Sequence, residues 1–164
     1  MLLTEVDRIE AQTPFIKDAV DESSLTPEQQ KFEQIMSSMT MRDLTMEGGK
    51  DASLGKGSYG EVQKATHKQL NIPIAVKKIE KRSLTSSKIK ETLIREIRIQ
   101  KQLNHDYLCR LYSSFEDKDT IYLALEFAAK GYLFFLIRKE KYLSEDTAFY
   151  FFIQVCSGIY HMHK

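Results

Sequence analysis

The sequence predicts an α+β fold in which antiparallel strands come first and helices follow. Between residues 60 and 76, apolar side chains indicate the two-residue period of a strand with one buried face, most clearly at Ile72, Ile74 and Val76. From Ser144 onward, apolar side chains gather at helical spacing behind a serine that can cap the first turn. Strands in the first part and helices in the second part give the α+β class.

Length and composition favour a globular protein inside the cell. The 164 residues are 42% hydrophobic and 29% charged, which suits one domain with a core. No stretch approaches 18 apolar residues, and charges interrupt the first 20 residues, so we expect neither secretion nor a membrane span. Cys109 and Cys156 lie in apolar segments and are interpreted as reduced core thiols of a cytoplasmic or nuclear protein. The four histidines lack metal-ligand neighbours, so no metal site is predicted.

Charge divides the chain into two parts. Residues 1–47 hold 10 acidic and 4 basic residues, whereas the remainder is basic overall. The excess of positive charge after residue 47 forms no long basic run, so nucleic acid is not an expected partner. We therefore predict an N-terminal extension over 1–47 and a domain that begins near Gly48-Gly49.

The extension is expected to be partly flexible, with one short helix near 27–38. Thr26, Pro27 and Gln29 supply a capping hydroxyl, a proline at the first helical position and the glutamine of a capping box. Apolar residues on one side of this helix pack on the neighbouring domain or, as an alternative, bind a partner along 27–39. These residues are Phe32, Ile35, Met36 and Met39.

Residues 48–128 carry the predicted strands and one helix. A pair of strands is expected on either side of the polar turn His67-Lys68-Gln69, and a second pair over 108–116 and 120–127. Between the pairs, Ser86-Ser87 opens a helix whose apolar stripe is interrupted by Glu96.

Residues 129–164 are expected to be helical. One helix is predicted over Tyr132–Lys139 and another from Ser144, with Glu145 and Asp146 in its positive first turn. Apolar residues cover a broad face of the last helix, so we expect it to be buried against more protein than these residues supply.

A glycine-rich segment, Gly55–Val62, matches the pattern GxGxxGxV. Glycines let a hairpin press its backbone amides against phosphate oxygens. A dinucleotide-binding motif would need an apolar strand before the glycines and a helix after them, but here the preceding residues are polar and a strand pattern follows. Taken alone, the motif also allows a purely structural turn.

Lys77 and Glu96 strengthen the phosphate-binding interpretation. Lys77 ends Ile74-Ala75-Val76-Lys77, an apolar strand beside the glycine hairpin, where its ammonium could reach phosphates. Glu96 lies 19 positions later on the predicted helix and could pair with this ammonium and orient it. The alternative is two unrelated exposed charges.

From Leu54 onward, the chain resembles a protein kinase catalytic domain, most closely the Aurora and phosphoinositide-dependent kinase families. The resemblance rests on the three motifs above and on Arg95-Glu96-Ile97, His105 and Leu108–Tyr112 at family spacing. It implies an N-lobe made of a five-stranded antiparallel sheet and one regulatory helix. A hinge, up to residue 128, would lead into the first helices of a truncated C-lobe over 129–164.

The resemblance also implies residue roles. Val62 and Ala75 would enclose adenine, Leu125 would be the gatekeeper, Glu126 and Ala128 would offer hinge backbone groups, and Glu96 would orient Lys77. The full set implied for nucleotide binding is Leu54, Gly55, Lys56, Gly57, Ser58, Tyr59, Gly60, Glu61, Val62, Ala75, Lys77, Leu125, Glu126 and Ala128.

The function implied is ATP-dependent phosphorylation of serine and threonine in protein substrates, with Mg²⁺ as a cofactor in the complete family. The motifs HRDxxxxN and DFG, which carry the catalytic Asp and the magnesium ligands, do not occur in the 164 residues. No catalytic or metal residue is therefore assigned, and the chain alone is expected to be inactive. The alternative is a catalytically inactive nucleotide-binding or scaffolding fragment.

Overall fold

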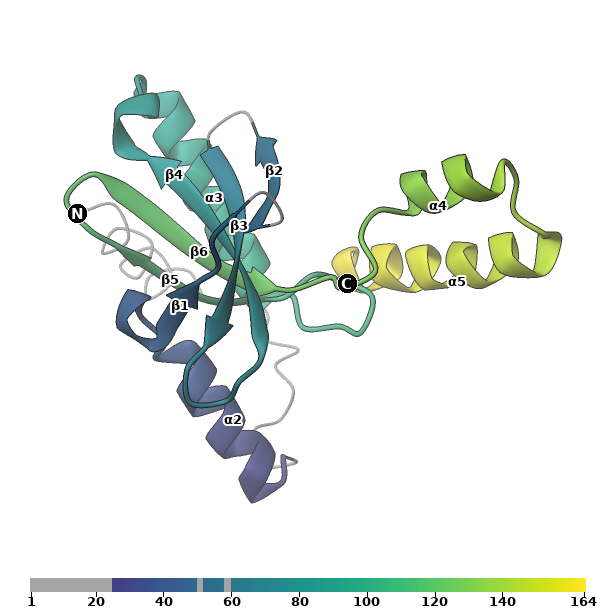
Figure 1. Ribbon diagram of the computed structural model, residues 1–164, viewed down its shortest axis with the longest axis horizontal. Helices are drawn as coiled ribbons and strands as arrows, with labels where there is room; N and C mark the ends of the chain where they lie inside the picture. The colour runs from purple at the N-terminus through teal and green to yellow at the C-terminus, as the bar shows by residue number, and fades with distance from the viewer. Residues whose placement is uncertain (1–24, 50–51, 58–59) are drawn as a thin grey trace. The chain divides into compact units, whose positions relative to one another are not determined.

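The computed structural model describes residues 25–49, 52–57 and 60–164 (Figure 1). The predicted flexible segment 1–24 and the loop residues Ser58 and Tyr59 lie outside the described residues. The described residues form two compact units. The first holds the residues up to Asn104 together with Arg110–Phe127, and the second holds His105–Cys109 and Ala128–Lys164.

A six-stranded antiparallel sheet forms the centre of the first unit, which confirms the predicted α+β class (Figure 1). The strand order is β1-β3-β4-β6-β5, and β2 also pairs with β3. The strands are β1 (Leu44–Met46), β2 (Ser53–Gly57), β3 (Gly60–His67), β4 (Pro73–Glu80), β5 (Leu111–Glu116) and β6 (Thr120–Glu126).

The sheet has one strand more than the five expected. The additional strand is β1, which pairs with the C-terminal half of β3, with Leu44 opposite His67 and Met46 opposite Ala65. It lies before Gly48-Gly49, so residues on both sides of the predicted boundary contribute to the same sheet. Its three residues are too few to show a strand period in the sequence.

Helix α3 (Ser87–Gln102) packs on one face of the sheet. Ser86 caps it by accepting a hydrogen bond from the backbone amide of Ile89. Leu93, Ile94 and Ile97 are buried against strand residues that include Ile79 and Leu123. Because side chains alternate along a strand, Ala75 and Lys77 lie on the same face of β4 as Ile79.

Helix α2 (Pro27–Ser37) contributes to a second core with residues of the other face of β4. Thr26 and Gln29 form the predicted capping box, with Thr26 N–H donating to Gln29 Oε1 at 2.8 Å. Met36 and Met39 are almost fully buried against Ile74, Val76 and Ala124. Of the two interpretations of this helix, the burial favours packing within the chain over a separate partner.

Two helices, α4 (Leu133–Glu140) and α5 (Glu145–Met162), make up most of the second unit. Tyr132 precedes α4, and Ser144 caps α5 as expected by accepting from the Thr147 amide. Most large apolar side chains of these helices are exposed. No helix in the described part of the chain is long and apolar enough to cross a membrane.

The second unit corrects two expectations. The strand predicted over 108–116 begins only at Leu111, because the Leu108 amide closes a turn onto the His105 carbonyl and the Leu108 side chain packs beside Gly158. The predicted core position of Cys109 and Cys156 is wrong, since both cysteines are exposed. The apolar residues around Cys156, such as Val155 and Ile159, are themselves exposed, so an apolar sequence segment did not indicate a buried one here.

Candidate nucleotide site

The glycine-rich segment forms a hairpin of β2 and β3. Gly57 pairs with Gly60 and Lys56 pairs with Glu61, with a register shift between Ser53 and Gly55. Leu54 lies within this shift, and Ser58 and Tyr59 at the turn are outside the described residues. The backbone amides expected to cradle phosphate thus lie around the end of a two-stranded ribbon.

Gly60 has a structural reason to be glycine. A Cβ atom built on it would lie 1.7 Å from the carbonyl oxygen of Lys78 on β4, far inside contact distance. Only glycine allows β3 to approach β4 so closely at this position. The close approach brings the hairpin next to the strand that carries Lys77.

The Glu61 side chain links the two strands of the hairpin, β2 and β3. Its Oε1 accepts a hydrogen bond from the Ser53 hydroxyl at 2.7 Å, which links the two strands. This hydrogen bond lowers the pKa of the exposed Glu61 carboxyl below its ordinary value of 4.5, because it stabilises the ionised form. Glu61 therefore stays charged at neutral pH and acts as a hairpin support.

Lys77 and Glu96 come together in the structure. Lys77 Nζ lies 2.9 Å from Glu96 Oε1, joining β4 to α3. The Glu96 side chain is 43% exposed, so it is not buried with the apolar residues of α3. The contact is the one that the sequence suggested, and its role in orienting the amine toward phosphate stays a prediction.

Several residues expected to contact the nucleotide share one face of the sheet. Val62 lies directly opposite Lys77 across β3 and β4, and Ala75 lies directly opposite Leu125 across β4 and β6. Residues opposite each other in antiparallel strands project to the same side. Val62, Ala75, Lys77 and Leu125 thus form one patch on the α3 side of the sheet.

The end of β6 carries Glu126, the first of the two expected hinge residues. The Glu126 amide donates to the Arg110 carbonyl at 2.9 Å, and Glu126 Oε2 accepts from the Arg110 amide at 3.2 Å. Lys64 places its ammonium 5.3 Å from the centre of the Phe127 ring, a cation–π contact one residue further on. The second hinge residue, Ala128, belongs to the other compact unit.

Sequence reasoning missed an ion pair between the N-terminal helix and the start of β5. The Arg110 guanidinium donates two hydrogen bonds to the Glu33 carboxylate, at 2.8 and 2.5 Å. The two residues are 77 positions apart, and neither stands out in its local pattern. A pair of this kind leaves no periodic signal, so only the fold reveals it.

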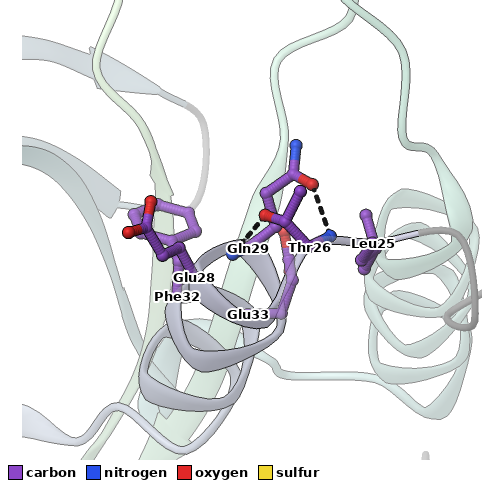
Figure 2. A pocket seen from close by; sticks show the side chains of 6 residues that line it. All are labelled: Leu25, Thr26, Glu28, Gln29, Phe32 and Glu33. Atoms are coloured by element: carbon purple, nitrogen blue, oxygen red, sulfur yellow. Dashed lines mark hydrogen bonds between the residues drawn. The ribbon is translucent and has the colours of Figure 1, made fainter.

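Two hollows of the first unit lie beside α2. One, of about 420 Å³, is lined by the first turns of α2 (Figure 2). Figure 2 shows its capping hydrogen bonds between Thr26 and Gln29 at the helix start. Another, of about 450 Å³, lies beside Glu33, Lys101 and Arg110. Neither contains Lys77, so the chemistry of the hairpin and not the size of a hollow identifies the candidate site.

Comparison with known proteins supports the resemblance to protein kinases. The protein kinase domain family matches residues 49–164. The chain is 40% identical over 111 residues to an Aurora kinase of Schizosaccharomyces pombe, covering 68% of this chain and 31% of that protein. It is 37% identical over 112 residues to the human NUAK family SNF1-like kinase 1, covering 68% of this chain and 17% of that protein.

A third relative, the mouse serine/threonine-protein kinase SIK1, is 35% identical over 114 residues, which cover 70% of this chain and 14% of that protein. The chain thus spans less than a third of the length of each of these relatives. The family match extends over most of the chain, from the residues just before β2 to the end of α5. The chain belongs to the protein kinase domain family.

Proposed function

We propose that this chain is the ATP-binding part of a protein kinase that transfers the γ-phosphate of ATP to serine and threonine hydroxyls of proteins. The observation that carries the proposal is the 2.9 Å pair of Lys77 and Glu96 beside the glycine hairpin. An amine held in place by a carboxylate can bind phosphate oxygens without reorganising when the nucleotide arrives. The serine and threonine preference is supported by the similarity to SIK1, which is a serine/threonine-protein kinase.

The residues fit the nucleotide better than they fit magnesium. The glycine hairpin, including Gly60, offers backbone amides to phosphate, and Lys77 offers a cation. Val62 and Ala75 offer an apolar surface to a base. Kinases hold Mg²⁺ with the DFG aspartate and the catalytic-loop asparagine. Neither motif occurs in the 164 residues, and no group of three acidic, histidine or cysteine side chains in the described ranges could hold a metal ion.

The missing motifs favour a second proposal for the 164 residues taken alone: they bind nucleotide without transferring phosphate. Glu96 is paired with Lys77, and Asp117 accepts hydrogen bonds within the β5–β6 turn, so neither is available as a base. Binding should be weak and insensitive to magnesium, because the metal ligands would have to come from residues outside this sequence.

Titration of the 164-residue chain with a non-hydrolysable ATP analogue, with and without magnesium, tests the nucleotide site. We expect saturable binding that Lys77→Met weakens and Lys78→Met leaves unchanged. Lys78 is a matched control because it lies on the opposite face of β4 and donates to Gln63 Oε1 at 2.7 Å. Equal binding by Lys77→Met and the wild type would refute the site.

A radiolabel transfer assay with a generic protein substrate tests the second proposal. We expect no transfer by the 164-residue chain. Transfer that survives purification and disappears in Lys77→Met would show that a base within these residues does the chemistry, and the proposal of binding without transfer would then be wrong.

A further inference from the structure

Arg110 contacts α2 through its side chain and the end of β6 through its backbone. Its guanidinium donates from Nη1 to Glu33 Oε1 and from Nη2 to Glu33 Oε2, a two-point pairing that fixes both side chains. Glu33 lies on α2, near the N-terminal end of the described chain, whereas Arg110 directly precedes β5. The pair therefore ties the N-terminal helix to the strand pair β5–β6.

The backbone of Arg110 has a separate partner. Its carbonyl accepts the Glu126 amide at 2.9 Å, and its amide donates to the Glu126 carboxylate at 3.2 Å. Glu126 is the last residue of β6, and the other compact unit begins two residues later. The backbone of Arg110 thus holds the last residue of β6 in place through two hydrogen bonds.

The Arg110 side chain also contacts the Tyr112 ring, which in turn contacts Phe32 of α2. The guanidinium carbon lies 5.6 Å from the centre of the Tyr112 ring, and Phe32 of α2 meets Tyr112 edge-on at 6.4 Å. The Arg110 and Glu33 side chains are 28% and 33% exposed. Because the pair is bidentate and partly shielded, it holds its geometry better than an ordinary surface ion pair.

We propose that Arg110 is a positioning residue through which α2 holds Glu126 and so adjusts the affinity of the nucleotide site for its base. The proposal rests on the proposed function together with the hinge role that the kinase resemblance implies for Glu126, whose backbone would contact the adenine edge. Docking of α2 would fix Arg110, and Arg110 would fix the backbone of Glu126. Release of α2 would loosen this end of β6 while leaving Lys77 and the glycine hairpin in place. The N-terminal helix would then tune base recognition without contacting nucleotide.

The test compares Glu33→Gln with the matched control Glu28→Gln on the same helix. Glu28 lies in the first turn of α2, more than one turn before Glu33, and the same amide replaces the same carboxylate. Hydrogen exchange of the peptide covering 120–127 is measured first, because it needs no ligand. We expect Glu33→Gln to speed exchange at Glu126 roughly fivefold, the loss expected for weakening one charge-assisted contact, and Glu28→Gln to leave it unchanged.

The second readout separates base from phosphate. Dissociation constants are measured for adenosine and for inorganic tripolyphosphate. Glu33→Gln should weaken adenosine binding about threefold and leave tripolyphosphate binding unchanged, whereas a general loss of folding would weaken both. The charge-exchanged variant Glu33→Arg/Arg110→Glu should restore part of the adenosine affinity and of the slow exchange.

The two proposals fail in different ways. If the wild-type chain binds neither adenosine nor tripolyphosphate, the proposed function is wrong, and the exchange data still decide whether α2 holds Glu126. If exchange at Glu126 in Glu33→Gln equals that of the wild type, the positioning role of Arg110 is wrong whatever the chain binds. If exchange rises but adenosine and tripolyphosphate affinities fall together, the link to base recognition is wrong.

Discussion

Lys77 Nζ on β4 lies 2.9 Å from Glu96 Oε1 on α3, although the two residues are 19 positions apart in the sequence. The contact depends on how α3 docks, because Leu93 and Ile97 on either side of Glu96 are buried in the core shared with the sheet. Both side chains are partly exposed, so the pair contributes only about 0.2–1 kcal/mol to stability. In the proposed nucleotide site, its larger effect would be to orient the Lys77 amine toward phosphate.

The Lys77–Glu96 pair should behave as one unit in nucleotide binding. Lys77→Met should weaken binding of a non-hydrolysable ATP analogue about tenfold or more, since a charge-assisted contact is lost. Glu96→Gln should weaken it less, and the double variant should be no worse than Lys77→Met. Isothermal titration of the four chains measures the coupling, and strictly additive losses would mean that Glu96 does not act through Lys77.

Gly60→Ala should destabilise the sheet. The added Cβ would meet the Lys78 carbonyl oxygen at 1.7 Å, and backbone cannot move aside as a side-chain tip can. We expect a loss of about 1–3 kcal/mol or more in the free energy of unfolding, measured by urea denaturation. Gly57→Ala is the control, because its nearest contact would be an ordinary 3.8 Å. Equal stability of the two variants would contradict the close β3–β4 approach.

Met36→Ala should show that α2 is part of the core of the first unit. Met36 is 1% exposed among Leu44, Ile74 and Val76. Removing its side chain leaves a cavity, which costs about 2–5 kcal/mol of unfolding free energy. Lys31→Ala on the exposed side of α2 should change stability by no more than about 0.5 kcal/mol. If Met36→Ala is equally harmless, the helix does not dock in solution.

The sequence predicted the helix starts well and the long-range contacts poorly. The capping residues Thr26, Ser86 and Ser144 each accept a hydrogen bond from the amide three positions later, so the local pattern contains the whole interaction. Strand β1 was missed because three residues show no period and its pairing with β3 is made by backbone groups. Burial periodicity therefore located the face of α2 without revealing the strand that follows it.

The candidate site shows the same division. The contact between Lys77 and Glu96 could be predicted from the sequence because each charged residue interrupts an apolar pattern. Such an interruption is unusual for a strand or helix that packs in a core. Arg110 and Glu33 break no pattern, since a charge at the start of a strand or on a half-exposed helix position is ordinary. Their contact follows from the docking of α2 on the sheet, which no local rule specifies.

Asp117 should make the free energy of unfolding decrease as the pH falls into the acid range. Its carboxylate accepts hydrogen bonds from the amides of Asp119 and Thr120 and from the Tyr122 hydroxyl. The amide of Asp119 is the largest cause that holds the pKa of Asp117 below its ordinary value of 3.8. Because the folded-state pKa is lowered, the contribution is present above about pH 3.8 and is lost as pH falls through the folded-state value.

Urea denaturation of Asp117→Ala and of the control Asp119→Ala checks this pH dependence. Asp117→Ala should be less stable than the wild type at pH 7, and the difference should shrink steadily as the pH is lowered below about 3.8. Asp119→Ala should follow the wild type more closely, because Asp119 contributes its backbone amide to the turn. A difference that is the same at pH 7 and pH 3 would mean that the charge of Asp117 has no part in it.

The exposed apolar face of α5 should make the 164-residue chain bind hydrophobic dyes. Phe149 and Phe152 are 64% and 62% exposed, and Ile153 and Ile159 are also exposed. A contiguous apolar surface of this kind binds dye and promotes self-association. We expect strong dye fluorescence and concentration-dependent light scattering, both reduced by Phe149→Ser/Phe152→Ser. Tyr142→Ser, an exposed aromatic outside the helices, serves as the control and should change neither. A monodisperse chain with negligible dye binding would show that this face is covered in solution.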